Sequence, residues 1–259
     1  MFIGMKRFFL AISVMAAFLA VSSCSTTRAL QDDEYRLRRN RIEVTNDKEF
    51  NTNVLTPYLK QRSIGWTPFL TVYNWTNGKG KAWDKLVQKV GVPPVVYDPS
   101  MVDESVEGIE KHLEYLGYYG SKAESLISVN KRKVDVTYMV TLGKRYPISR
   151  INLSLPEGGE FRQAFLADTS SMTVKKGDFL SEASLETETE RSAAQLRNQG
   201  FFTFNKNHFF FEADTLTEPG SAILNMSIRE YTRNASPKDA QPIRKFYIDD
   251  VTVSYPRSL

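Results

Sequence analysis

One pattern occurs twice in the sequence, and it constrains the fold more than any other feature. The copies are DPSMVDESVEGIEKHLEYLGYY, residues 98–119, and SEASLETETERSAAQLRNQGFF, residues 181–202. Each begins with a residue suited to cap a helix, Asp98 or Ser181, whose side-chain oxygen accepts a free N–H of the first turn. Each ends, at the same distance from the cap, at a glycine suited to a left-handed helix end, and an aromatic pair follows. The shared order and spacing predict two copies of one folding unit.

The segments around the first copy predict the order strand, helix, helix, strand, strand. Residues 40–45 alternate between apolar and charged side chains, which is typical of a strand. Residues 50–61 are a candidate short helix, in which Pro57 marks a kink or the true start. After the capped helix, residues 123–130 and 133–142 predict a hairpin.

The segments around the second copy predict the same order. Residues 146–155 read as a strand with a bulge after Ile148, and residues 160–167 as a short helix. After the capped helix, residues 207–214 and 222–230 predict the closing hairpin.

The fold class that follows is α+β, with two tandem β-α-α-β-β units at residues 40–143 and 144–232. Residues 24–39 are polar and predict a tether that becomes ordered near Tyr35. Residues 233–259 read as a linker and the start of a third unit, with strand-like alternation at residues 246–255. A lone strand has no partner for its backbone groups, so we expect it to be mobile or to join an available sheet edge. We also expect the physiological protein to be longer.

An aromatic insertion, residues 63–97, interrupts the first unit. It holds all three tryptophans of the chain, Trp66, Trp75 and Trp83, together with Phe69 and Tyr73. The favoured interpretation is a hydrophobic cluster packed onto the first unit, because buried aromatic side chains usually serve packing. The alternative is an aromatic surface that meets a membrane or a partner.

The N-terminus reads as a secretory signal over residues 1–23. Lys6 and Arg7 precede an apolar run, residues 8–21, that is too short to cross a membrane comfortably. The run ends in a pattern that resembles a bacterial lipobox and predicts lipidation of Cys24, the only cysteine: Val21, Ser22, Ser23, Cys24. The alternative is an ordinary signal peptide with an incidental cysteine.

Composition and charge narrow the function. A hydrophobic content of 41% and a charged content of 25% are ordinary for a globular chain. The net charge of +4 includes the two basic residues of the signal. The positive charge of the rest of the chain is too small to indicate nucleic-acid binding. We therefore expect no nucleic-acid partner.

No constellation of catalytic or metal-binding residues is apparent. His112 lies on the charged face of its helix and His208 opens a strand, and neither has metal-ligand spacing. Three alternating acids, Glu186, Glu188 and Glu190, are interpreted as a solvated helix face rather than a carboxylate cluster. We predict no enzyme activity, no catalytic residue, no metal and no cofactor.

Several motifs carry a resemblance to a known family. They are LGYY at 116–119, QGFF at 199–202, YPISRI at 146–151, PIRKF at 242–246, CSTT at 24–27 and PPVVYDP at 93–99. In this order, over roughly residues 24–255, the chain resembles the periplasmic POTRA region of BamA/TamA-type outer-membrane assembly factors of Bacteroidetes-like bacteria. Members of that family continue beyond such units into a membrane-embedded domain, so activities that depend on that domain are not carried over.

The resemblance implies a lipid-anchored module on the periplasmic side of the outer membrane. Its expected partners are unfolded outer-membrane protein precursors or accessory assembly proteins, bound by strand addition to an exposed sheet edge. The candidate edge residues lie in the first strand of each hairpin: Ile127, Val129, Phe209, Phe210 and Phe211.

Three alternatives stay open at this point. The edges could simply be guarded against aggregation. The chain could be a cell-envelope hydrolase, although no set of residues in the sequence indicates a catalytic site. It could also be a purely structural envelope lipoprotein without a client.

Overall fold

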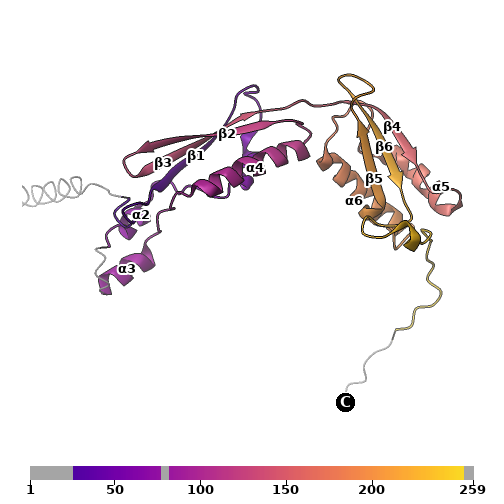
Figure 1. The fold of residues 1–259 in the computed structure, drawn as a ribbon. Helices are drawn as coiled ribbons and strands as arrows, with labels where there is room; N and C mark the ends of the chain where they lie inside the picture. Colours follow the sequence, from indigo (N-terminus) through magenta and orange to yellow (C-terminus); the bar gives the residue numbers. More distant parts are fainter. Residues whose placement is uncertain (1–25, 77–81, 254–259) are drawn as a thin grey trace, which may run out of the picture. The chain divides into compact units, whose positions relative to one another are not determined.

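A computed structural model of the chain describes residues 26–76 and 82–253 (Figure 1). The chain divides into two compact units, one comprising the chain up to Ile109 together with Ala123–Thr141, the other Glu110–Lys122 together with the chain from Leu142. Two three-stranded sheets are formed by the described residues, and their strands follow one another in the same spatial order. This agreement between the two sheets confirms the predicted α+β class.

The first sheet has the order β1-β3-β2, with bounds β1 (Arg36–Val44), β2 (Lys122–Asn130) and β3 (Lys133–Thr141). β1 runs parallel to β3, with a register shift between Leu37 and Arg39. The alternating apolar positions of β3 are buried and form the floor of this unit: Val134, Val136, Tyr138 and Val140. Because side chains of a strand alternate between its two faces, these four residues all face the core from the central strand of the sheet.

Among the described residues, four helices separate β1 from β2: the 3₁₀ helix η1 (Thr52–Tyr58), α2 (Pro68–Tyr73), α3 (Ala82–Val90) and α4 (Pro99–Tyr115). The predicted short helix around Pro57 is thus a 3₁₀ helix that contains the proline. A buried hydroxyl of α4 contacts the chain just after η1, because Ser105 Oγ accepts a hydrogen bond of 2.9 Å from the N–H of Lys60.

The second sheet has the order β4-β6-β5. Its unit contains β4 (Ile148–Ser154), α5 (Gly159–Asp168), α6 (Glu182–Asn198), β5 (Phe209–Asp214) and β6 (Ala222–Ile228). β4 runs parallel to β6 with a register shift after Ile148, which confirms the predicted bulge, and β5 runs antiparallel to β6. The core between sheet and helices is dominated by aromatic side chains, among them Phe161, Phe165, Phe201, Phe204 and Phe209.

The two repeated helices begin and end in the same way. Asp98 accepts the N–H of Ser100 at 2.9 Å, and Ser181 accepts the N–H of Ser184 at 3.2 Å. Gly117 and Gly200 have φ of 89° and 99°, the left-handed conformation expected of a residue that ends a helix. The N–H of the next residue reaches back five positions to a carbonyl, from Tyr118 to Leu113 at 2.8 Å and from Phe201 to Leu196 at 3.1 Å.

The N-terminal tether is an incorrect prediction over the described residues. Thr26 and Leu30 are buried, and β1 begins at Arg36 rather than at residue 40. The guanidinium Nη1 of Arg36 donates to Thr26 Oγ1 at 2.7 Å, and the N–H of Ala29 donates to Asn74 Oδ1 at 3.1 Å. The polar composition of this segment conceals these contacts, because its polar groups bond to the insertion and to β1 instead of to water.

The favoured interpretation of the aromatic insertion is wrong for its tryptophans. Trp66, Trp75 and Trp83 are 64%, 52% and 50% exposed. Leu70 and Val87, in α2 and α3, are the buried contacts of the insertion. Smaller side chains are therefore buried within the insertion, whereas its tryptophans and Phe69 face outward.

The predicted strand at residues 246–255 is not formed over its described part, residues 246–253. Ile243 packs against the aromatic core of the second unit, and the N–H of Phe246 donates to the carbonyl of Gly200 at 2.8 Å. The segment thus attaches to the end of α6 as an irregular chain. A strand needs a neighbour for its backbone groups, and none adjoins it among the described residues.

Candidate interaction edge

The lipobox lies outside the described residues. Val21, Ser22, Ser23 and Cys24 therefore stay predictions at this point. Within residues 26–76 and 82–253, no helix combines the length and the apolar character needed to cross a bilayer.

The second half of β2 is exposed at an edge of the first sheet. β2 has a neighbour, β3, on one side only. Leu126, Ile127 and Val129 are 57%, 49% and 56% exposed. Because consecutive residues of a strand point to opposite faces, the exposure of both Leu126 and Ile127 means that neither face is covered here. Leu126 is not among the edge residues predicted from the sequence. The signal that could have found it is the apolar pair at 126–127, which breaks the alternation of apolar and polar side chains along the strand.

The backbone donors of β2 follow from its hairpin. A two-residue turn, Lys131-Arg132, joins β2 to β3, and Lys131 has φ of 55°. Such a turn places Asn130 opposite Lys133 as a hydrogen-bonded pair. Bonded and non-bonded positions alternate along an antiparallel strand, so the N–H groups of Ile127 and Val129 face away from β3. These are the groups that an added strand would bind.

The opposite edge of the same sheet differs in its chemistry. β1 carries three arginines that reach solvent: Arg38, Arg39 and Arg41. Arg38 Nε donates to Asp135 Oδ1 at 2.7 Å, across to β3. Charged side chains along an edge strand discourage pairing with another chain. β1 is therefore guarded, and the apolar half of β2 is not.

In the second sheet, β5 is an edge strand whose side chains are already engaged. Phe209 is 1% exposed and belongs to the core. Phe211 stacks on Phe209 with ring centroids 6.2 Å apart. Phe210 is covered by Arg229, whose Cζ lies 4.0 Å from the ring centroid, and by the ring of Tyr231 at 5.7 Å. The phenylalanines therefore stabilise the unit, and only the backbone of β5 is available for strand addition.

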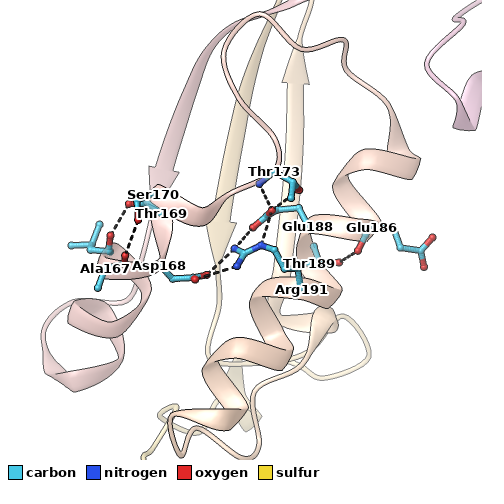
Figure 2. Close-up of polar contacts among 10 residues, drawn as sticks. Ala167, Asp168, Thr169, Ser170, Thr173, Glu186, Glu188, Thr189 and Arg191 are labelled. Atoms are coloured by element: carbon cyan, nitrogen blue, oxygen red, sulfur yellow. Dashed lines mark hydrogen bonds and ion pairs between the residues drawn. The ribbon is translucent and has the colours of Figure 1, made fainter.

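Glu188 is not part of a solvated helix face, contrary to the sequence-based interpretation. Its side chain is 1% exposed. Arg191 donates from Nη2 to Glu188 Oε1 at 2.6 Å and from Nη2 to Asp168 Oδ2 at 2.8 Å, so the cation lies between two carboxylates (Figure 2). Thr173 adds its N–H and its hydroxyl to Glu188 Oε2, both at 2.7 Å. The neighbouring acids Glu186 and Glu190 do face solvent, where both bind Lys206.

The electrostatics of this group are those of a structural ion pair. Burial by itself would raise the pKa of Glu188, but the hydrogen bonds from Arg191 and Thr173 outweigh burial and lower the pKa. The same carboxylates hold the pKa of Arg191 above its usual value. A carboxylate that stays ionised and fully bonded is unsuited to general acid or base work. The signal in the sequence is the pairing of Glu188 with Arg191 one turn later, but the spacing alone does not reveal that Asp168 closes the group.

Neither histidine is arranged as a ligand. His208, at the end of the 3₁₀ helix η3 (Lys206–His208), is buried, and its Nδ1 accepts the N–H of Asn205 at 3.3 Å. Burial lowers the pKa of His208 and of the half-buried His112. Among the described residues, no three histidine, cysteine or acidic side chains converge as a metal site.

Comparison with known proteins finds similar solved structures only. No protein-family model and no curated protein matches the chain. POTRA domains 3–5 of Haemophilus influenzae BamA match with 13% identity and a TM-score of 0.38, over 75% of this chain and 61% of that one. BamA of Haemophilus ducreyi lacking POTRA domains 1–3 matches with 15% identity and a TM-score of 0.39, over 75% of this chain and 29% of that one. The chain thus spans less than two thirds of either protein.

The N-terminal domain of Omp85 from Thermosynechococcus elongatus is also similar. It matches with 10% identity and a TM-score of 0.31, over 76% of this chain and 63% of that one. At this level of similarity, the function has to be inferred from the geometry of this chain.

Proposed function

We propose that this chain is a lipid-anchored interaction module on the periplasmic side of the outer membrane. It serves an outer-membrane protein assembly or translocation factor, and it binds extended segments of unfolded precursors or accessory proteins by strand addition. The support comes from the lipobox that ends at Cys24, from the two β-α-α-β-β units and from the sheet edges these units present.

The observation that carries the proposal is the unguarded half of β2. An edge strand with exposed apolar side chains on both faces is a liability for a free protein, because another chain can pair with it. In a binding module the same edge is a template, since main-chain groups supply the affinity and alternate side chains the selectivity. Leu126, Ile127 and Val129 would then contact the alternate side chains of the bound segment.

The two candidate edges are not equivalent. On β2, backbone donors and exposed apolar side chains coincide. On β5, Phe209 and Phe210 are committed to the core and to Arg229, and Glu212 and Asp214 place acids on the strand. We assign β2 as the principal binding edge and β5 as an edge where only the backbone contributes.

A proline substitution tests this assignment. Ile127→Pro removes one outward N–H without removing a bond to β3, whereas Ile127→Ala keeps the N–H and shortens the side chain. The probe is a synthetic extended peptide of alternating valine and threonine residues, and its control is the same peptide with alternate amides methylated. Peptide affinity should fall about tenfold for Ile127→Pro and by less for Ile127→Ala, because a lost hydrogen bond is compounded by a clash.

Hydrogen exchange reports the same contact directly. Binding of the unmethylated peptide should slow exchange at the amides of Ile127 and Val129, and the methylated peptide should leave exchange unchanged. If folded Ile127→Pro binds the peptide as well as the parent chain does, β2 is not the binding edge.

A further inference from the structure

An aromatic surface of unassigned role lies on the insertion in the first unit. We define it by six side chains that are all at least half exposed: Trp66, Phe69, Trp75, Trp83, Leu86 and Val90. All three tryptophans of the chain are among them. Single exposed apolar residues are ordinary, but six within residues 66–90 indicate a site of interaction with a membrane or a partner.

The outward orientation is built into the insertion. Leu70 and Val87 face inward and are buried, and Thr76 Oγ1 donates to the buried carboxylate of Asp84 at 2.8 Å. These contacts orient α2 and α3 independently of the aromatic side chains. On α3, Trp83, Leu86 and Val90 follow the spacing i, i+3, i+7 and share one face of the helix.

The charge of the insertion is one-sided. Residues 63–97 contain four lysines, at 79, 81, 85 and 89, and a single acid, Asp84. That acid is 3% exposed, so the charge presented to the surroundings is positive. Lys85 and Lys89 are exposed on the same helix as Trp83. A helix with an apolar face and basic flanks is typical of a segment that lies in the interface of an anionic membrane.

The aromatic surface is also joined to the site of the predicted lipid. Ala29 donates its N–H to Asn74, the residue that ends α2 and precedes Trp75. Thr26 is held by Arg36, whose Nη2 also bonds the carbonyl of Ile64 at 2.8 Å, close in sequence to Trp66. Only Ser25 separates Thr26 from Cys24, and two residue steps of extended chain span at most about 7 Å.

We propose that the aromatic surface lies in the headgroup region of the membrane to which Cys24 is attached. Its tryptophans occupy the interface, where an apolar ring with one polar N–H is favoured. Lys85 and Lys89 contact the phosphates of anionic lipids. The lipid and the surface together hold the first unit in one orientation, which a lipid chain alone cannot do. The proposal rests on the lipid anchor of the proposed function for the side on which the bilayer lies.

The tryptophans themselves are the reporters. The acylated protein is reconstituted in vesicles of phosphatidylethanolamine with a minority of phosphatidylglycerol, with and without bromine on the acyl chains. The same polypeptide made without residues 1–24, and therefore without acyl groups, is mixed with the same vesicles. We expect tryptophan emission to shift to the blue and to be quenched by the brominated lipid in both samples.

Matched variants locate the contact. Phe69→Ser combined with Leu86→Ser keeps every tryptophan, and it should weaken vesicle binding of the acyl-free chain about tenfold. Leu126→Ser combined with Val129→Ser removes equally exposed apolar side chains from β2 and should leave vesicle binding unchanged. Lys85→Glu combined with Lys89→Glu should weaken binding to the anionic vesicles about tenfold or more, and a smaller effect is expected with phosphatidylcholine alone.

The outcomes separate this proposal from the lipid anchor. If the acyl-free chain is quenched but Cys24 of the full chain is found to carry no fatty acid, the aromatic surface is supported and the lipid anchor is overturned. Acylated protein that stays on the vesicles with unquenched tryptophans overturns the surface and keeps the anchor. A blue shift that appears without vesicles as protein concentration rises, and that Phe69→Ser with Leu86→Ser abolishes, assigns the surface to a second copy of the chain and overturns the proposal.

Discussion

At the scale of single residues, the most consequential group is the cation between two carboxylates in the second unit. Arg191 is 25% exposed at its side chain, whereas Glu188 and Asp168 are 1% and 7% exposed. Taking such charges out of water is costly, and the cost is offset only while every partner is present. The exposed pairs of Lys206 with Glu186 and Glu190 carry no comparable penalty, because water screens them.

Loss of the buried cation should therefore destabilise the second unit strongly. Arg191→Met leaves Glu188 and Asp168 facing each other without a cation, and should cost about 3–5 kcal/mol of unfolding free energy. The control Lys206→Met should cost less than about 1 kcal/mol. Urea unfolding followed by circular dichroism measures both. If Arg191→Met and Lys206→Met lower the unfolding free energy equally, the burial of Glu188 does not increase the contribution of Arg191 to stability.

Glu188 also predicts a pH dependence. Its pKa is lower in the folded unit than in the unfolded chain, where a glutamate titrates near about 4.3. The resulting stabilisation is fully present above that unfolded value and is lost as pH falls through the folded pKa. Glu188→Gln should flatten the acid limb of a plot of stability against pH. An acid limb of unchanged steepness would assign the acid sensitivity to other carboxylates.

At the scale of elements, the C-terminal segment shows how context replaces a predicted strand. Residues 246–253 alternate like a strand, yet the neighbouring contacts are made by Ile243 and by the N–H of Phe246 at the end of α6. Alternation favours a strand only where a sheet edge accepts it.

Deletion of the C-terminal segment tests whether it contributes to the stability of the second unit. The sequence alone predicts that deleting residues 242–259 leaves stability unchanged within about 0.5 kcal/mol, as for changes away from a core. The contacts of Ile243 and Phe246 instead predict a loss of about 1–2 kcal/mol. Deletion of residues 247–259 keeps both contacts and is the matched control. If neither deletion changes the urea midpoint, the prediction from the sequence alone is correct and the contacts of Ile243 and Phe246 add no stability.

At the scale of the whole molecule, the proposed lipid anchor at Cys24 would decide which partners the chain meets. Cys24→Ala should abolish incorporation of a labelled fatty acid, because the thiol of Cys24 is the acceptor that we propose. Cell fractionation should then find an unprocessed or unacylated protein. The control is Ser25→Ala, which leaves the thiol in place. Labelling of Cys24→Ala to the level of the parent would mean that the lipobox is an ordinary signal-peptide end.

Local signals in the sequence determined the order of the elements. Asp98, Ser181, Gly117 and Gly200 act within one turn of a helix, and the alternation of β3 within one strand, so each is legible without knowledge of the rest of the chain. The bulge after Ile148 was predictable for the same reason, since it shows as a change of phase within one strand. The repeat of these signals was enough to predict two β-α-α-β-β units.

Only the tertiary structure decided which side chains are covered. Glu188 and Glu190 lie two residues apart on α6, yet one is buried beside Asp168 and the other faces solvent. Trp83 is exposed because Val87 takes the inner side of α3, and Phe209 is buried because β5 closes over the core. Burial depends on what residues distant in the sequence bring to the same place, and composition and periodicity do not carry that information.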